Sequence, residues 1–308
     1  MTLYGFDTWS ARDQDSSLRE AWLASERFKA DCDWSRVPGT CGLCGSSKGF
    51  ALAADADRAQ PNVRESLLCL SCKHSARIRA SLRLLLDHLS QGQSKPNMSG
   101  EPLRGLGARL QHWLGWNRGG ATLPTVYVTE QMTPAFLWLQ RHLRADLHGS
   151  EFQPDPDKLH ALSQSFRSAG GIGDVSFQDV TQLSFEDASL DAITSFDVLE
   201  HVPDYSKAIA EFGRTLRPGG VCVATFPFTD GPSTVVRAKM DEQGAVTHLL
   251  EPEYHGDPIG DGVLCFYHFG WDVLDNFRAA GFRSVRMVMP WNHDQGCLYG
   301  LWSLMAIR

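Results

Sequence analysis

The sequence has 308 residues, 43% of them hydrophobic, which is enough for one large buried core and a small second domain. Its formal net charge is −7, and because proteins dominated by phosphate binding are usually basic, this balance disfavours nucleic acid as a partner. No apolar run reaches the roughly 18–20 residues of a membrane helix. The N-terminus lacks a basic start followed by an apolar block, so we expect a cytoplasmic protein with no membrane partner.

Residues 1–35 predict an N-terminal helical segment. Leu18, Trp22 and Phe28 supply the apolar positions of one helix face. Such a helix either packs on the main body of the protein or forms a lid over a site, and the pattern leaves both open.

Residues 36–90 contain two CxxC pairs, Cys41–Cys44 and Cys69–Cys72. Without a secretion signal, paired cysteines favour a metal over disulfides. Four thiolates close a tetrahedron around zinc and leave no open coordination position, so we predict a structural zinc-binding module. The basic residues Lys73, Arg77 and Arg79 follow. They either contact a phosphate or substrate carboxylate or form a solvated helix end.

Residues 91–120 are rich in Gly, Ser, Pro and Asn and predict a linker. The remaining residues, 121–308, predict an α/β sheet domain. Its first strand is expected at Thr125–Thr129, and the second at Asp146–Ser150. A third is expected at Val175–Gln178. Thr133-Pro134 has the sequence of a helix N-cap followed by proline at the first helical position.

The run from Gln178 to Gly220 carries the strongest signal. Ala192–Phe196 predicts a strand with Asp197 at its carboxyl end, and apolar residues from Tyr205 to Leu216 recur at helical spacing. Pro218-Gly219-Gly220 ends that helix, and Val221–Phe226 resumes as a strand. A strand, a crossover helix and a second strand imply a parallel sheet, and ligands bind such sheets at the carboxyl ends of the strands.

This run resembles the class I S-adenosylmethionine-dependent methyltransferases, most closely the type 11 group with DxxxLPFxDxSFDxVxxxxVLEHxxD followed by LxPGG. The matching residues are Asp179, Leu183, Ser184, Phe185, Asp187, Ser189, Leu190, Asp191, Val198, Leu199, Glu200, His201, Asp204, Leu216, Pro218, Gly219 and Gly220. The resemblance implies a Rossmann-like seven-stranded sheet, mostly parallel with an antiparallel last strand. Phe282–Pro290 and Leu298–Ile307 match its sixth and seventh strands. Some bacterial methyltransferases carry a similar CxxC…CxxCxxxxRxR element before this domain, so the resemblance extends to the zinc module.

The resemblance also implies where the cofactor binds. Glu151, at the end of the second strand, would accept hydrogen bonds from the ribose diol, and it lies 21 residues after Glu130. Asp179 is the family's position for the adenine amine. Phe152 and Val180 would cover the faces of the adenine ring.

The methionine end of the cofactor needs groups from the first loop, at Glu130, and from the strand end at Phe196 and Asp197. The family's first motif is usually glycine-rich, because glycine lets the backbone approach a ligand. Residues 129–134 contain no glycine, so the loop must be shaped differently. A related subgroup has a similarly degenerate motif with an acidic residue near Glu130.

Three histidines are candidate catalytic bases: His201, His255 and His268. His201 follows Glu200 at the start of a helix. His255 lies in a PEYHGDP segment and His268 in FYHFGW, both of which recur in this subgroup. For each histidine, tying or capping a loop is the alternative role to catalysis.

Taken together, the sequence predicts a methyltransferase that uses S-adenosylmethionine on a small-molecule acceptor and holds a structural zinc ion. An RNA methyltransferase is the alternative, and it requires Lys73, Arg77, Arg79 and Arg83 to form a basic face with the site. A cofactor-binding protein without methyl transfer is the second alternative.

Overall fold

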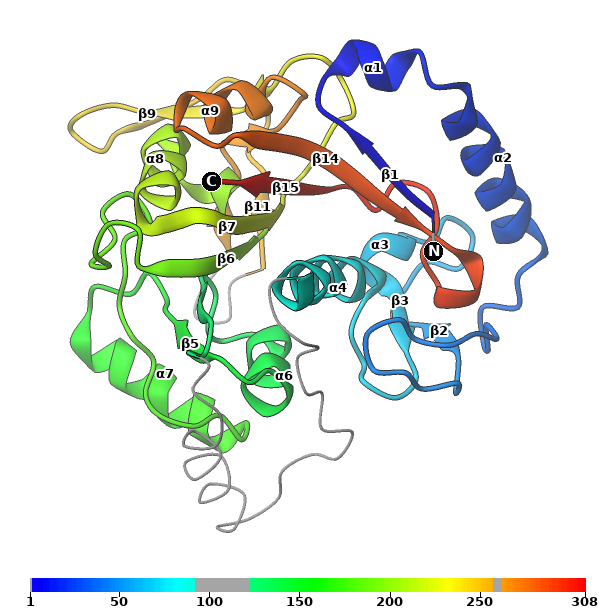
Figure 1. Ribbon diagram of the computed structural model, residues 1–308, viewed down its shortest axis with the longest axis horizontal. Helices are drawn as coiled ribbons and strands as arrows, with labels where there is room; N and C mark the ends of the chain where they lie inside the picture. The colour runs from blue at the N-terminus through cyan, green and yellow to red at the C-terminus, as the bar shows by residue number, and fades with distance from the viewer. Residues whose placement is uncertain (1, 92–121, 257–261) are drawn as a thin grey trace.

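The computed structural model describes residues 2–91, 122–256 and 262–308 (Figure 1). Its centre is a seven-stranded sheet. In order across the sheet, the strands are β1 (Thr2–Phe6), β14 (Ser284–Trp291), β15 (Ser303–Ile307), β7 (Leu216–Thr225), β6 (Leu190–Phe196), β4 (Thr125–Val128) and β5 (Asp146–Gly149). Strands β5, β4, β6 and β7 are parallel, and β15 is antiparallel to β7. Strands β14 and β1 also pair antiparallel, so the predicted seven-stranded Rossmann-like sheet is present as a mixed sheet.

Both faces of the sheet are buried. Successive side chains of a strand point to opposite faces, so each strand contributes to the apolar clusters on both sides. In β4, Val126 and Val128 belong to one apolar cluster and Tyr127 to the other. The first face is covered by α4 (Ala76–Gln91), α6 (Pro134–His142) and α7 (Pro156–Ser168). The second is covered by α8 (Tyr205–Thr215) and α9 (Val273–Ala279) (Figure 1).

The N-terminal segment contains α1 (Trp9–Asp13) and α2 (Ser16–Asp31), so the predicted helix is present. The buried Ser25 hydroxyl of α2 accepts hydrogen bonds from Trp291 Nε1 at 3.1 Å and Tyr299 N at 3.0 Å. These contacts pack α2 on the C-terminal part of the chain rather than over a site. Strand β1, which pairs antiparallel with β14, was not predicted.

The cysteine module consists of β2 (Phe50–Leu52), α3 (Val63–Ser66) and β3 (Leu67–Cys69), and it leads directly into α4. Phe50, Leu85 of α4 and Val223 of β7 lie in the same apolar cluster. Ser81 of α4 also shares a 3.0 Å hydrogen bond with Ser303 of β15. The module therefore extends the core of the sheet rather than having one of its own. The predicted linker lies almost wholly outside the described residues.

Two sequence predictions need correction. The expected third strand, Val175–Gln178, forms only one bridge, between Glu151 and Phe177. Side chains take its backbone donors instead, because Ser176 N donates to Gln131 Oε1 at 3.2 Å and Val175 N to Ser163 Oγ at 2.9 Å.

The second correction concerns Pro218-Gly219-Gly220, which is not a turn before a strand. Helix α8 leads straight into β7 at Leu216, and the register shifts between Leu216 and Val221. Gly219 has a φ of 87°, which glycine adopts without strain, and its N–H donates to Arg308 O at 2.9 Å. This stretch is an irregular first part of β7.

Between β7 and α9 the chain forms short antiparallel pairs. They are β8 (Val235–Val236), β9 (Ala238–Met240), β10 (Val246–His248), β11 (Tyr254–His255), β12 (Val263–Leu264) and β13 (Tyr267–His268). Two 3-10 turns, η1 (Leu199–His201) and η2 (His293–Gln295), follow β6 and β14. Among the described helices, none has the length and hydrophobicity to span a bilayer.

Candidate functional site

Three predicted site residues meet where the parallel strands end. Glu130 follows β4, Glu151 follows β5, and Asp197 follows β6. Glu130 Oε2 accepts from the Phe196 amide at 3.4 Å, so it links the ends of β4 and β6. Glu151 Oε1 accepts from the Met132 amide at 2.6 Å, which links the end of β5 to the first loop. The carboxyl edge of the sheet is thus lined with carboxylates.

The first loop takes a shape that does not need glycine. No residue from 129 to 134 has a positive φ. The buried Gln131 anchors the loop, because its side-chain amide donates to Asp174 O at 2.9 Å and its backbone N–H donates to Ser150 O at 3.0 Å. Thr133 caps α6 by accepting from Phe136 N at 3.2 Å, as predicted. Side-chain hydrogen bonds therefore hold this loop.

Glu130 is held in an unusual state. Burial raises its pKa to about 8, although the Thr129 hydroxyl and the Phe196 amide, which both donate to Oε2, partly oppose this. Its other oxygen, Oε1, is buried and has no hydrogen-bond partner among the described residues. A buried polar atom without a partner is costly unless something binds to it. Glu130 is therefore a carboxyl group poised near neutral pH beside the site.

Asp197 is paired with two arginines of the cysteine module. Arg64 Nη2 lies 3.0 Å from Asp197 Oδ1, and Arg77 Nη2 lies 3.4 Å from Oδ2. Burial acts to raise the pKa of Asp197, but these guanidinium groups outweigh it and the pKa is lowered. Glu65 also pairs with both arginines.

The backbone of Asp197 has a φ of 58°, in the left-handed region that few non-glycine residues adopt. The interactions of its side chain hold it there. The sequence pattern placed Arg77 only in a basic cluster and gave no signal for Arg64. Neither was assigned to the strand ends, and nothing in local sequence places Arg64 there.

The predicted adenine side is open to solvent. Phe152 and Phe177 are exposed by 65% and 44%, and their ring centroids lie 5.7 Å apart. Asp179 Oδ1 accepts from both the amide and the hydroxyl of Thr181, at 2.8 and 2.7 Å. Val180 is half-buried and packs against the core. Exposed aromatic rings beside Glu151 form a surface suited to a flat ring.

The three predicted histidines lie together around Glu200 and Glu253. His255 Nε2 and His268 Nε2 lie 3.0 and 3.1 Å from the same oxygen, Glu253 Oε1. The rings of His201 and His255 meet edge to face, with centroids 4.9 Å apart. Glu200, whose own pKa is raised by burial, and then Glu253 raise the pKa of His255 to about 9.

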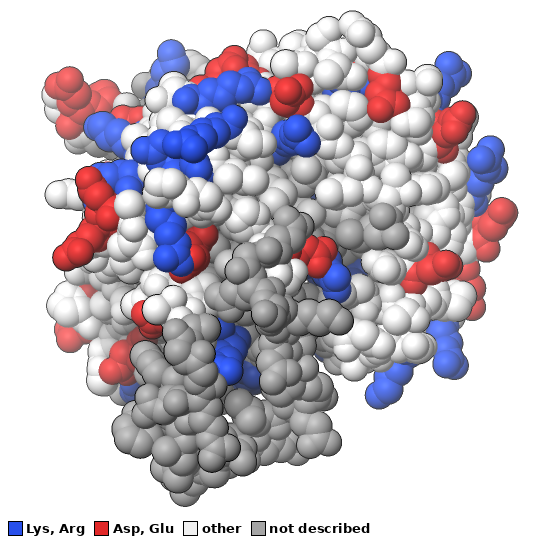
Figure 2. Space-filling model, in the orientation of Figure 1, with Lys and Arg blue, Asp and Glu red and all other residues white. Residues whose placement is uncertain are grey.

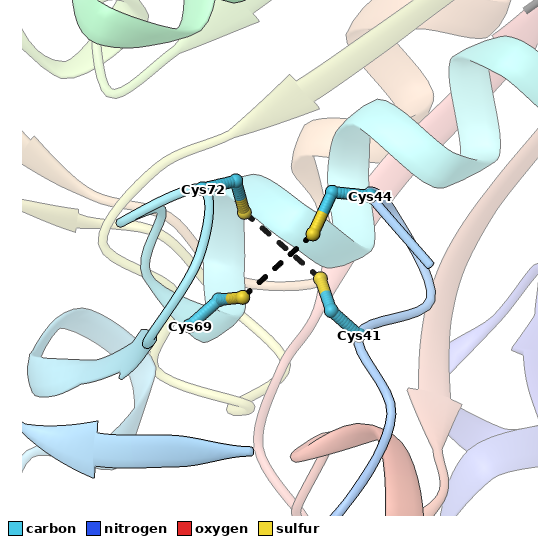
Figure 3. A group of neighbouring side chains, drawn as sticks. All are labelled: Cys41, Cys44, Cys69 and Cys72. Carbon is cyan, nitrogen blue, oxygen red and sulfur yellow. Dashed lines mark hydrogen bonds between the residues drawn. The ribbon is translucent and has the colours of Figure 1, made fainter. Parts of the chain in front are cut away.

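The four predicted cysteines form one cluster (Figure 3). Cys41 Sγ lies 4.0 Å from Cys72 Sγ, and Cys44 Sγ lies 3.8 Å from Cys69 Sγ. A tetrahedral ion with Zn–S bonds of ~2.3 Å needs sulfurs ~3.8 Å apart. The donor set and its spacing therefore fit a zinc ion without rearrangement.

The basic residues after Cys72 do not form one exposed face. Arg79 is buried, donates to Leu67 O at 2.7 Å and His74 O at 2.8 Å, and lies over the Phe50 ring. Arg83 pairs with Asp87 at 2.8 Å. Figure 2 shows Lys and Arg gathered instead over the region of α8 and α9, with acidic side chains among them. Arg79 cannot contribute to a basic face.

Comparison with known proteins gives matches to part of the chain. Residues 135–224 match the family described as "Methyltransferase domain". A probable S-adenosylmethionine-dependent methyltransferase of Mycolicibacterium smegmatis is 37% identical over 109 residues, which cover 33% of this chain and 42% of that protein. An uncharacterized methyltransferase of Mycobacterium marinum is 38% identical over 80 residues, covering 26% of this chain and 31% of that protein. The chain thus aligns with less than half of these relatives.

Among solved structures, an S-adenosylmethionine-dependent methyltransferase from Mesorhizobium loti is similar with a TM-score of 0.39 and 18% identity. The alignment covers 61% of this chain and 92% of that one. The matched family segment, residues 135–224, runs from α6 through β7 and contains Glu151, Asp179 and Asp197.

Proposed function

We propose that this protein is an S-adenosylmethionine-dependent methyltransferase that acts on a small molecule and carries a structural zinc ion. The observation that carries the proposal is the carboxylate-lined edge at the ends of β4, β5 and β6. Two of its carboxylates, Glu151 and Asp197, lie within residues 135–224, which match the methyltransferase domain family. Ligands of parallel α/β sheets bind at this edge.

The residues at this edge suit the parts of the cofactor. Glu151 and Asp179 have carboxylate oxygens for the ribose diol and the adenine amine, and the exposed Phe152 offers a face for the adenine. Arg64 and Arg77 pair with Asp197 and so fix the strand end that faces the methionine end of the cofactor. When bound, the cofactor supplies an activated methyl group, so positioning of donor and acceptor accounts for much of the rate.

A small-molecule acceptor is favoured over RNA by the charges. The net charge is −7, Arg79 is buried, and Arg77 is paired with Glu65 and Asp197. Of the four basic residues that an RNA site requires, only Lys73 and Arg83 are exposed. Protein–RNA binding that weakens steeply with salt would contradict this choice.

The cofactor assignment is tested by calorimetric titration with S-adenosylmethionine. We expect Glu151→Ala and Asp179→Ala each to weaken binding by about 1–3 kcal/mol, the cost of losing hydrogen bonds to a charged group. Glu186→Ala is the matched control, since Glu186 is an exposed carboxylate before β6, at its other end. Its affinity should equal that of the unaltered protein.

Two results would count against the cofactor assignment. No detectable heat at millimolar cofactor would remove the methyltransferase proposal altogether. If Glu151→Ala and Asp179→Ala both bind the cofactor as tightly as the unaltered protein, the cofactor is kept but its position beside Glu151 and Asp179 is refuted. Binding without methyl transfer to any acceptor would favour the non-catalytic alternative.

A further inference from the structure

We propose that Glu200, His201 and His255 form a second metal site, for a first-row divalent cation, distinct from the cysteine cluster. The inference goes beyond the proposed function and does not depend on it. The ligand atoms of these three residues lie within 4.8 Å of one another. Two imidazoles and one carboxylate are a donor set typical of Zn²⁺, Fe²⁺, Co²⁺ and related ions.

A single carboxylate oxygen faces both rings. Glu200 Oε1 lies 3.8 Å from His201 Nε2 and 3.6 Å from His255 Nδ1. Bonds of ~2.0–2.2 Å from one ion to such ligands place the ligand atoms ~3–3.5 Å apart. The observed spacings exceed these by a few tenths of an ångström, which small side-chain rotations can close.

The fold builds this arrangement from two elements. Glu200 and His201 lie on η1, directly after β6, and His255 lies on β11. The β11–β12 pair lies beside η1, and Phe266 N donates to the backbone oxygen of Glu200 at 2.8 Å. These backbone contacts hold His255 beside Glu200 and His201.

The outer nitrogens of both histidines are already engaged. His201 Nδ1 lies 2.9 Å from Leu264 O, and a carbonyl only accepts, so Nδ1 carries the proton. His255 Nε2 lies 3.0 Å from Glu253 Oε1 and donates to that carboxylate. This leaves His201 Nε2 and, in the neutral ring, His255 Nδ1 as lone pairs aimed at Glu200. Metal-binding histidines characteristically donate their other N–H to a carbonyl or carboxylate in this way.

Glu200 supplies an independent indication that a ligand belongs here. Its side chain is fully buried, and neither carboxyl oxygen has a partner within hydrogen-bond distance among the residues that the structure describes; the two imidazoles lie just beyond it, at 3.6 and 3.8 Å from Oε1. A buried carboxylate is expected to be paired or to bind a metal. The alternative is a protonated His255 between Glu200 and Glu253. That arrangement leaves Glu200 Oε2 and the inward lone pair of His201 unmatched.

The neighbouring group of Glu253, Cys265 and His268 is the weaker candidate. Arg237 lies 3.2 Å from Glu253 Oε2, and both histidines share Glu253 Oε1. Glu253 is therefore occupied by cationic and hydrogen-bonding partners. It acts instead as the outer carboxylate that orients His255.

With three protein ligands, an ion at Glu200 keeps an open position for water or an oxygen of another molecule.

Cobalt uptake tests the proposal. Protein carrying zinc in its cysteine cluster is titrated with Co²⁺, which binds more weakly than Zn²⁺ and so leaves that cluster intact. We expect one further equivalent to bind, with visible d–d absorption but without thiolate charge-transfer bands. Glu200→Gln and His255→Asn should each weaken this binding at least tenfold. His255 is partly exposed, so its variant remains informative if Glu200→Gln does not fold.

His268→Asn is the matched control, because His268 contacts Glu253 but not Glu200. It should bind Co²⁺ as the unaltered protein does. The proposal is overturned if the protein takes up no Co²⁺ beyond its zinc, or if Co²⁺ uptake is unchanged in both Glu200→Gln and His255→Asn. It is also overturned if His268→Asn is the one variant that loses Co²⁺ binding. The readout is metal content and absorption, so failure of the methyltransferase proposal would leave this test intact.

Discussion

Removal of the proposed zinc ion from the cysteine cluster is expected to destabilise the whole protein rather than its N-terminal part alone. In Cys69→Ser, a buried cysteine of the cluster is lost, and we expect the proposed zinc ion to be lost with it. Structural zinc contributes about 10–16 kcal/mol in small zinc peptides, and a fraction of that is large against ordinary domain stability. At about 2–4 °C per kcal/mol, a loss of several kcal/mol lowers Tm by ~10 °C or more.

The cooperative effect follows from the shared core. Phe50 beside the cluster and Leu85 of α4 pack in the same apolar layer as Val223 of the sheet, so loosening the module exposes the sheet face. Thermal melting followed by near-UV circular dichroism, with metal content measured in parallel, checks this. Cys32→Ser is the control, since Cys32 lies outside both CxxC pairs and should keep the zinc. Metal-free protein that melts at the same temperature as the zinc form would refute the structural role.

Local patterns in the sequence predicted the features that depend on neighbours in the chain. The apolar spacing after Asp204 predicted α8, and the Thr133-Pro134 cap predicted the start of α6. The two CxxC pairs predicted a cluster that the structure brings together. In each case, the interaction that decides the structure lies within a few residues or within one repeated spacing.

Features that depend on distant partners were not predicted. Strand β1 pairs with β14 across more than 280 residues, and Arg64 reaches Asp197 from a different module. The third strand is nearly absent because Gln131, from another loop, takes one of its backbone donors. The candidate bases were named one by one, but their convergence on Glu200 and Glu253 depends on the β11–β12 pair.

The neutral state of Glu130 predicts a stability that falls as pH rises. The carboxyl has an ordinary pKa of 4.5 and a folded-state pKa of about 8. Below pH 4.5 the Glu130 carboxyl is protonated in both the folded and the unfolded protein, so its ionisation does not change the free energy of unfolding. Between pH 4.5 and about 8 the unfolded chain releases a proton that the folded protein retains, which favours unfolding. Each pKa unit corresponds to about 1.4 kcal/mol, so the total loss is on the order of 3–5 kcal/mol and levels off above pH 8.

Glu130→Gln isolates this contribution, because glutamine keeps the carbonyl that accepts from Thr129 and Phe196 but does not ionise. Denaturant unfolding without cofactor should give similar stabilities for the two proteins near pH 4.5. The variant should then become the more stable protein by several kcal/mol at pH 8. Glu186→Gln, at an exposed position, controls for general effects of charge. Curves for Glu130→Gln and the unaltered protein that stay parallel from pH 4.5 to 8 would mean that Glu130 ionises normally, and that its unpartnered oxygen is solvated rather than kept for a ligand.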